Sequence, residues 1–540
     1  MKQILPLLLA LSLTLTACGG SGAASFSAPG GGEAADSTVI ALSDDGITVD
    51  GAAISTDSAS AVYAANDIVY YESGKDFTYG EGTIEDEHDA AEAAAHTVVH
   101  ITEPGAYTLS GALSLGQIAV DLGEDAEDDP NARVTLILDG VDITCTVAPA
   151  VIFYNVYECG DKDDPKAEVD TSNAGANILL TDSVNNISGS YVARIYKSVE
   201  LSEDGTEVVD SKKLHKYDAA FYSKMSMNVD GTGTLNIDAE NEGLDSELHL
   251  TINGGSINIA SGNDGINTNE DGVSVTTING GDVNIVVDGA TGEGDGIDSN
   301  GWLVINGGSV TTSACSISMD AGIDSDMGIY LNGGAVCAAG GMLDRIEDGG
   351  QTHIVFSFPT TQKGGTTYTL KDSTGAIVGE WTPVNDFTTL VVSNDALTEG
   401  TYTLWQGETQ LSAASGMQGG FGGMRPEMPE DGEMPEPPEG FEPGEMPEGI
   451  EPPMDGARPE MPEDVTMNDD GTITLPDGTV IDPGEMRGER PAGEMPEGVE
   501  PPAGGFGGGR GGMSGGMNAA ETTTEFPLTA GANYFTVQAQ

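Results

Sequence analysis

Short alternations of apolar and polar residues run through most of the chain between positions 96 and 411. The strands in runs such as LTINGGSINIA and ARVTLILDGVDITC place an apolar residue at every second position, which is typical of a β-strand with one buried face. Gly, Pro-Gly and Asp-Gly steps separate the runs, and no run keeps the period of a helix. The pattern predicts an all-β fold.

Four of these runs end in a Gly-Gly pair, at positions 254, 280, 307 and 333, so the spacings are 26, 27 and 26 residues. A fixed period of this length indicates a solenoid or a propeller. A propeller blade needs about 40 residues, whereas one coil of a parallel β-helix, with three short strands and three turns, fits the observed period. We therefore predict a right-handed parallel β-helix over residues 96–350, with Ile, Leu and Val stacked inside it.

The composition changes several times outside these coils. The predicted parts are a signal peptide over 1–17, a flexible lipid-anchored tether over 18–95, a small β-sandwich-like domain over 351–411, a disordered Gly/Pro/Glu/Met-rich tract over 412–520 and a strand over 521–540 that returns to the sandwich-like domain. Two insertions, at 158–170 and 195–217, interrupt the first coils.

The N-terminal apolar run ends in Leu-Thr-Ala-Cys, which resembles a bacterial lipobox. Cys18 is then expected to carry a lipid, which would place the protein on the bacterial cell surface and limit membrane contact to that anchor. The other cysteines are Cys145, Cys159, Cys315 and Cys337. Their spacing fits no metal site and leaves open whether each neighbouring pair forms a disulfide or stays reduced.

The net charge of the chain limits the kinds of partner that it can bind. The chain has 19 Lys and Arg against 88 Asp and Glu, a formal net charge of −69. Such a surface repels nucleic acid and anionic lipid, so we expect no nucleic-acid partner, and it favours cations or ligands that are held through cations.

Four turns of the coils repeat a carboxylate, a glycine, an aliphatic residue and a second oxygen-bearing residue, in NEGLDSE, NDGINTNE, GDGIDSN and DAGIDSD. Equivalent positions on stacked strands lie about 4.8 Å apart, and two unit charges at that distance repel by roughly 3 kcal/mol at an effective dielectric constant of about 20. No Lys or Arg occurs between Lys224 and Arg345 to offset this repulsion.

A calcium ion would neutralise these carboxylates, because it binds six to eight oxygen atoms in flexible geometry. The expected ligands are Glu242, Asp245, Asp264, Asn267, Asp295, Asp298, Asp320 and Asp324. The alternative is that these side chains only close turns through hydrogen bonds to their own backbone and stay solvated.

The order of motifs ITEPGAYTLSG, GQIAVDL, VTLILDGVDIT and DAAFYSKMSMNVDGTGTLNI, followed by the acidic coils, resembles the calcium-dependent parallel β-helix carbohydrate-binding lipoproteins of anaerobic bacteria. The resemblance spans about 96–411 and the Gly/Met-rich tail. It implies a non-catalytic surface protein that binds plant cell-wall polysaccharide, acidic pectin or cellulose, with structural calcium. The insertions and the Glu-Pro-Met tract depart from that pattern, which leaves the glycan preference open.

Two other functions are compatible with the sequence. A calcium-dependent pectate lyase needs a base near the uronate carboxylate, and residues 225–344 contain no Lys or Arg. A structural adhesin without a glycan ligand would need no site at all. We expect a binding protein and no catalytic residues.

Overall fold

The computed structural model of the chain describes residues 37–202, 205–414 and 522–538, together with three short strands between 466 and 481. Apart from α1 (Ala90–Ala93) and the 3-10 helix η1 (Glu124–Asp128), the regular elements of these residues are β-strands. The all-β class is confirmed. None of the helices in the described residues has the length and apolar composition needed to cross a membrane.

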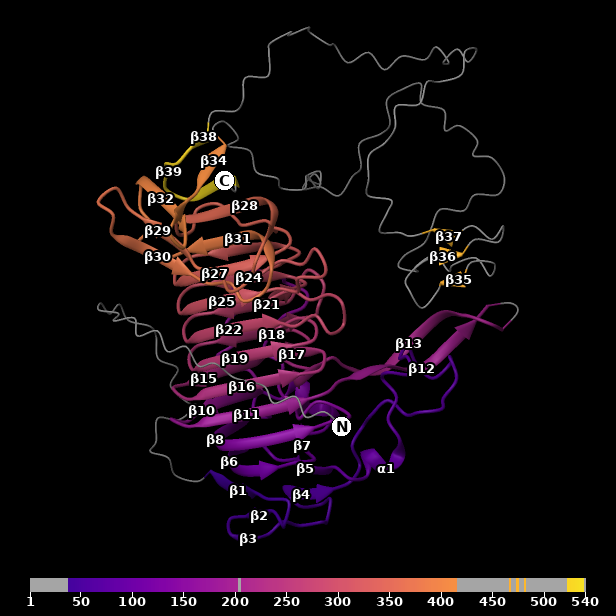
Figure 1. Cartoon of the computed structure of the whole chain (residues 1–540). Helices are drawn as coiled ribbons and strands as arrows, with labels where there is room; N and C mark the ends of the chain where they lie inside the picture. The colour runs from indigo at the N-terminus through magenta and orange to yellow at the C-terminus, as the bar shows by residue number, and fades with distance from the viewer. Residues whose placement is uncertain are drawn as a thin grey trace, which may run out of the picture. The chain divides into compact units, whose positions relative to one another are not determined.

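Most strands belong to three columns in which successive strands pair in parallel (Figure 1). The first column contains β8 (Val134–Cys145), β11 (Val184–Gly189), β16 (Thr234–Ala239), β19 (Ser256–Ser261), β22 (Asp282–Val287), β25 (Ser309–Ser313) and β27 (Ala335–Gly340). The second contains β8 again, β10 (Ala176–Leu180), β15 (Met227–Gly231), β18 (His249–Ile252), β21 (Val275–Ile278), β24 (Trp302–Ile305) and β26 (Gly328–Leu331).

The third column begins with an antiparallel pair, β4 (Val62–Ala65) and β5 (Thr97–Ile101), and then continues in parallel. Its further strands are β7 (Gly116–Asp121), β9 (Val151–Asn155), β14 (Ala219–Ser223), β17 (Glu242–Ser246), β20 (Ile266–Thr268) and β23 (Ile297–Ser299).

Register between strands explains the sequence period. In the second column Ile252, Ile278, Ile305 and Leu331 lie opposite one another. All four are at most 1% exposed, so each strand adds one aliphatic side chain to a continuous buried row. Their separations are 26, 27 and 26 residues, which are the separations of the Gly-Gly pairs. The repeat therefore reflects one strand of this column for each turn of chain.

The Gly-Gly pairs are required by backbone geometry. The second glycine of a pair has a positive φ, for example 83° at Gly281 and 76° at Gly308, a region that other residues rarely adopt. A Cβ on Gly308 would lie 2.5 Å from the carbonyl oxygen of Gly281 in the preceding turn. No other residue fits between turns packed this closely.

Residues 37–95 are not a flexible tether. Strand β1 (Thr38–Leu42) pairs in parallel with β6 (Gly105–Leu113), and β2 (Thr48–Val49) and β3 (Ala52–Ala53) add antiparallel strands beside it. Ile40, Leu42 and Tyr71 are buried in the same core as the columns. The physical reason is that β6, which pairs with β8 on one side, would otherwise present an open strand edge on the other, and β1 covers it. Residues 18–36 lie outside the described residues.

The insertion predicted at 195–217 forms most of a two-stranded antiparallel hairpin, β12 (Val192–Leu201) with β13 (Val208–Tyr217). The hairpin projects from the side of the stacked strands (Figure 1). Several register shifts along it mark bulges, which bend a two-stranded ribbon.

The final part of the fold combines chain segments far apart in sequence. Strand β31 (Phe387–Ser393) pairs antiparallel with β27 of the first column and with β28 (His353–Gln362), so residues 351–411 continue the sheet of the coils. Strand β40 (Ala532–Gln538) then pairs in parallel with β28. The aromatic side chains of Phe356, Phe526 and Phe535 contact one another between these elements.

The remaining strands of this part are short. They are β29 (Tyr368–Lys371), β30 (Ile377–Trp381), β32 (Gly400–Gln406), β33 (Thr409–Gln410), β34 (Ser412–Ala414), β38 (Thr522–Thr523) and β39 (Phe526–Leu528). A separate unit, residues 424–517, contains an antiparallel sheet of β35 (Thr466–Met467), β36 (Ile473–Thr474) and β37 (Val480–Ile481). The rest of the predicted disordered tract lies outside the described residues.

The cysteines form no disulfide in the described part of the chain. Cys145, Cys159, Cys315 and Cys337 are all free thiols.

The buried rows give a direct test of the register. Ile305→Ala removes a fully buried side chain from the second column, and such a change lowers the free energy of unfolding by about 2–5 kcal/mol. The matched control is Ile377→Ala on β30, where the isoleucine is 59% exposed and the expected change is below about 0.5 kcal/mol. Urea unfolding followed by circular dichroism measures both, and equal effects would contradict the assigned register.

Candidate functional site

The acidic turns lie in the third column, where parallel pairing fixes their side chains relative to one another. Pairing of β17, β20 and β23 places Asp245, Asn267 and Asp298 opposite one another on successive strands. The amide of Gly243 donates to the carbonyl of Asp264, and that of Gly265 donates to the carbonyl of Asp295. These bonds put a second row, Glu242, Asp264 and Asp295, in register beside the first.

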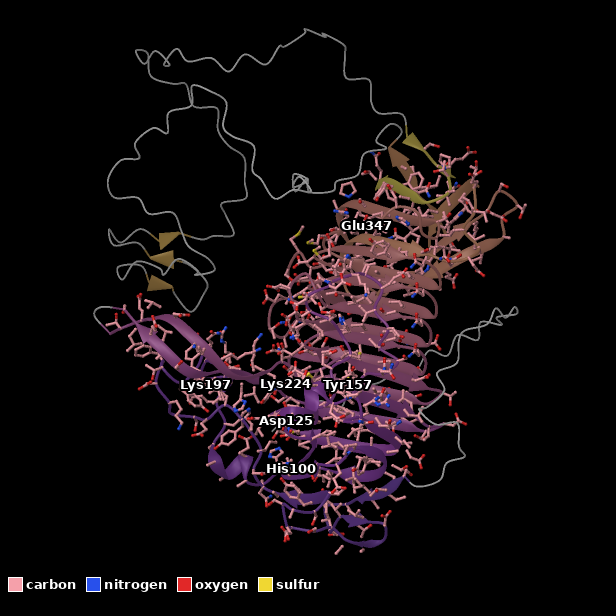
Figure 2. The ribbon with its side chains drawn as sticks, turned by 180° about the vertical axis from the view of Figure 1, so that it is seen from behind. His100, Asp125, Tyr157, Lys197, Lys224 and Glu347 are labelled. Atoms are coloured by element: carbon pink, nitrogen blue, oxygen red, sulfur yellow. The ribbon has the colours of Figure 1, made fainter. Side chains whose placement is uncertain are left out.

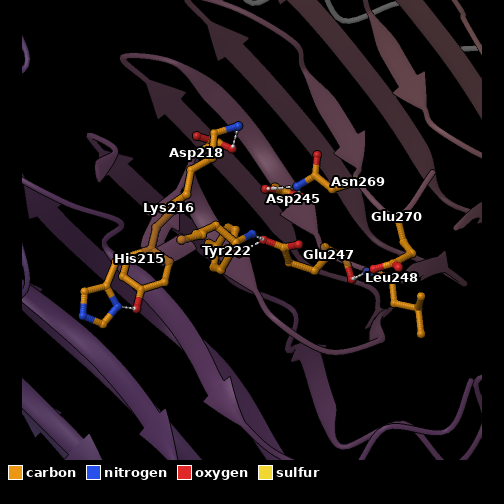
Figure 3. A network of polar contacts seen from close by, with 12 residues as sticks. His215, Lys216, Asp218, Tyr222, Asp245, Glu247, Leu248, Asn269 and Glu270 are labelled. Carbon is orange, nitrogen blue, oxygen red and sulfur yellow. Dashed lines mark hydrogen bonds and ion pairs between the residues drawn. The ribbon is translucent and has the colours of Figure 1, made fainter. Parts of the chain in front are cut away.

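One group of three carboxylates lies near the start of this arrangement. Asp218, Glu242 and Asp245 are all buried, and one oxygen of each lies within 4.8 Å of those of the other two. Asp218 directly precedes β14, whereas Glu242 and Asp245 belong to β17. Strands β14 and β17 are neighbours, and Figure 3 shows Lys216, from β13, reaching Asp218. The distance from Lys216 Nζ to the Asp218 carboxylate is 2.7 Å.

Hydrogen bonds position the side chains of this group, but some of its buried oxygen atoms accept none. Asn269 Nδ2 donates to both carboxylate oxygens of Asp245 at 3.0 Å, and Asn267 Nδ2 donates to Glu242 Oε1 at 3.3 Å. Within the described residues, Glu242 Oε2 and Asn267 Oδ1 are buried without any hydrogen-bond partner. Buried oxygen atoms of this kind are costly unless a proton donor or a cation satisfies them.

A second group forms two turns further along the column. Asp295, Asp298 and Asp324 are half-buried and again bring one oxygen each to within 4.8 Å of the others. Asp324 Oδ1 is buried and has no hydrogen-bond partner among the described residues. The two groups contain five of the eight predicted ligands.

The three other predicted ligands have different positions. Asn267 lies on β20, between the strands of the two groups, and Asp264 directly precedes the Gly265-Ile266 step of the same turn. The carboxylate of Asp264 accepts a hydrogen bond of 2.6 Å from the amide of Asp295. Asp320 lies outside both groups.

The position of Asp320 follows from the register of the fourth turn. The amide of Gly296 donates to the carbonyl of Ala321, so Ala321 occupies the place that Asp295 has one turn earlier. Asp320 is one residue too early in the chain, and its carboxylate accepts hydrogen bonds from the Gly294 amide and the Ser318 hydroxyl.

Electrostatics explains why these groups attract cations or protons. Burial raises the pKa of Asp295 to about 9, and the charges of Asp264 and Asp324 add to the shift. Burial and neighbouring carboxylates also raise the pKa of Asp264, Asp298 and Asp324 to about 7. Each oxygen row is therefore protonated in part at neutral pH when no cation is bound, because two adjacent carboxylates resist ionising together.

The first group follows the same rule despite its lysine. Burial raises the pKa of Asp218, and the Lys216 charge offsets this only in part. Burial, followed by the Asp218 charge, raises the pKa of Glu242 and of Asp245 well above the usual range. When all three carboxylates are ionised, the single ammonium of Lys216 leaves the group with a net negative charge.

A family of carbohydrate-binding domain-containing proteins matches residues 95–414, more than half of the chain. The chain belongs to this family. Membership supports carbohydrate binding in general as its function, and the matched range contains both carboxylate groups and the hairpin.

Two individual proteins are similar to parts of this family member. A carbohydrate-binding domain-containing protein of Acetivibrio thermocellus is 29% identical over 162 residues, which are 30% of this chain and 44% of the relative. The chain thus matches less than half of that relative's length. The solved structure of a polysaccharide lyase-like protein from C. thermocellum, a gadolinium derivative, has 21% identity and a TM-score of 0.33 over 55% of this chain and 89% of that chain.

Sequence reasoning missed one member of the first group. Asp218 stands in DAAFYS, which lacks the glycine and the second acidic residue of the later turns. The available signal was its alignment with NEGLDS, since β14 pairs in register with β17. The predicted lipid-bearing Cys18 lies outside the described residues.

The raised pKa values predict how stability depends on pH in this carbohydrate-binding protein without a divalent cation. A carboxyl whose pKa rises from 3.8 to about 7 or 9 on folding binds more protons folded than unfolded. The free energy of unfolding in chelator should therefore fall as pH increases from about 4 to 9. Urea unfolding across this range measures the fall.

Asp295→Asn provides the matched test, because an amide cannot ionise and should flatten the fall most clearly between about pH 7 and 9, where the other carboxyls have already ionised. The control is Asp282→Asn, which changes an exposed carboxylate on β22 and should leave the pH dependence unchanged. Identical profiles for wild type and Asp295→Asn would show that Asp295 does not titrate in this way.

Proposed function

We propose that the protein is a non-catalytic, cell-surface lipoprotein that binds acidic plant cell-wall polysaccharide through a calcium-loaded, right-handed parallel β-helix. Polygalacturonate is the primary candidate ligand and cellulose a second one. The observation that carries the proposal is the pair of carboxylate groups with orphaned buried oxygens, for which Lys216 is the one ion-paired cation among the described residues. The three columns of parallel strands support the β-helix, and the family match supports the glycan.

Calcium fits the chemistry of these groups. Carboxylates, Asn amides and backbone carbonyls are the oxygen ligands that calcium accepts in six- to eight-fold, irregular arrangements. Asp218, Glu242 and Asp245 would hold one ion, and Asp295, Asp298 and Asp324 another. A bound ion would supply positive charge to the rows, and at the half-buried second group it would also offer a coordination site for the carboxylate of a uronate.

Few aromatic residues are present for the alternative, stacking mode of sugar binding. Trp302, at the start of β24, is the only tryptophan between residues 225 and 344. Recognition through charge therefore suits these coils better than recognition through aromatic platforms, and it favours acidic over neutral glycans.

A lyase is the enzyme that this arrangement most resembles, because Lys216 lies beside a candidate cation site. A lyase base must give up its proton to accept another from the substrate. Burial acts to lower the pKa of Lys216, but the Asp218 carboxylate outweighs burial and raises it. Lys216 therefore stays charged at neutral pH, which favours holding an anion over abstracting a proton.

The lipid anchor belongs to the same proposal. The signal-like residues 1–17 and the Leu-Thr-Ala-Cys sequence that ends at Cys18 support export and attachment to the outer face of a membrane. Replacement of Cys18 by Ala should release the protein from the membrane fraction.

Chelation tests the calcium part. A ligand at one hundred times its dissociation constant stabilises the folded state by about 2.7 kcal/mol per site, so chelator should lower the melting temperature by several degrees. Calcium should restore it, and magnesium should do so poorly, because magnesium demands regular octahedral geometry. Asp245→Asn and Asp298→Asn should each reduce the effect, whereas Asp282→Asn should not. A melting temperature that chelator leaves unchanged would contradict calcium loading.

Glycan binding and catalysis are tested together. Retention on insoluble polygalacturonate should require calcium over the same concentration range that stabilises the fold. Incubation with soluble polygalacturonate should give no increase in the ultraviolet absorbance of unsaturated products. Absorbance that rises with enzyme concentration would establish a lyase instead, and failure to bind any insoluble plant glycan would favour a structural adhesin.

A further inference from the structure

A cleft of about 540 Å³ lies between the hairpin and the outer face of the third column. Strands β5, β7, β9 and β14 provide one wall, and residues 213–217 of β13 provide the other. Glu158 and Lys162, from the insertion after β9, line it as well. Its volume is within the range of pockets that enclose a small ligand. Both insertions that interrupt the coils thus contribute to one cavity.

The cleft concentrates the rare positive charges of the chain. Four of the 11 lysines line it, namely Lys162, Lys213, Lys216 and Lys224. Two histidines, His100 and His215, line it too. In a chain with a net charge of −69, this grouping of lysines offsets part of the repulsion that an anion would otherwise meet, although carboxylates line the cleft as well.

Ion pairs occupy three of these lysines. Lys162 pairs with Glu270 and Lys213 with Glu247, both at 3.2 Å, and Lys216 pairs with Asp218. Lys224 is exposed and makes no ion pair with any described residue. Figure 2 shows Lys224 on the side of the molecule from which the hairpin, with Lys197, projects. Its ammonium is the cation available to a ligand.

The rest of the lining indicates a sugar. Tyr154 is half-buried, and its ring makes an edge contact with Tyr217 at 5.5 Å between centroids; Tyr217 contacts Tyr222 at 5.3 Å. Tyr217 and Tyr222 are buried, so Tyr154 is the ring of these three that offers a ligand an apolar surface together with a hydroxyl. Five carboxylates also line the cleft: Asp67, Asp121, Glu127, Glu158 and Glu247. Hydroxyl groups donate to carboxylates, whereas a multiply charged phosphate would be repelled by them.

We propose that this hairpin cleft is a second glycan-binding site, which takes a short carboxylate-bearing oligosaccharide, pairs its carboxylate with Lys224 and needs no bound cation. The class of ligand rests on the proposed function, but the cleft itself is separate from the calcium-dependent surface. A uronate oligosaccharide supplies one anionic group for Lys224, hydroxyls for the carboxylates and C–H faces for Tyr154.

Isothermal titration calorimetry with trigalacturonate tests the cleft, performed in calcium and in chelator at a temperature where circular dichroism shows the protein folded in both. Wild type should bind in both conditions. Lys224→Gln removes the charge, leaves a polar side chain one atom shorter, and should weaken binding about tenfold. Lys224→Arg retains the charge and should restore most of the affinity. The matched control is Lys363→Gln, a lysine whose side chain is 81% exposed and outside the cleft.

Three results would overturn the proposal: equal affinity of wild type and Lys224→Gln, equal affinity for trigalacturonate and neutral cellotriose, or loss of trigalacturonate binding in chelator. The last result, combined with calcium-dependent retention on polygalacturonate, would refute the cleft and leave the proposed function intact. Trigalacturonate binding that persists in chelator and depends on Lys224, without any calcium-dependent retention, would support the cleft and refute the calcium-mediated function.

Discussion

Parallel pairing in strict register between successive turns of chain governs this structure. Because the register is constant, each residue of one strand lies opposite the equivalent residue of the next strand, and the two are separated by the distance between neighbouring strands. Where that position is aliphatic, as at Ile278 and Ile305, the outcome is a continuous buried row. Where it is acidic, the same rule forces like charges together, as at Glu242, Asp264 and Asp295. The stable core and the strained carboxylates are thus two results of one constraint.

That constraint also determines how much could be predicted from sequence. The Gly-Gly spacing of 26, 27 and 26 residues equals the separation of paired residues in the second column, because a repeated glycine is needed wherever a Cβ would strike the neighbouring turn. Five of the eight predicted ligands fall into two compact groups for the same reason. Periodic features of the sequence report periodic features of the fold.

Structural features that occur only once in the fold could not be predicted from the repeats. The composition before residue 96 predicted a tether. A strand of only five residues, β1, is nevertheless enough to cover the edge of β6 and to bury Ile40 and Leu42. Asp320 was included by its motif, although a shift of one residue moves it out of its row. The hairpin cleft depends on how two insertions with no repeat partner lie against the third column, and on ion pairs such as Lys213 with Glu247, 34 residues apart. Local sequence does not encode such long-range pairing.

The pairing of β40 with β28 has a consequence for how the chain reaches this state. His353 lies opposite Ala532, so β28 meets that neighbour only after a further 179 residues have been made. The strands of the three columns differ from β28 in this respect. From β21 onward each strand of the second column pairs with a strand that lies 26 or 27 residues earlier in the sequence, and contacts of short sequence separation form fastest. Assembly can therefore advance turn by turn during synthesis, while the sheet edge at β28 stays open. The edge of β28 that receives β40 is closed only when the C-terminal segment of the chain arrives.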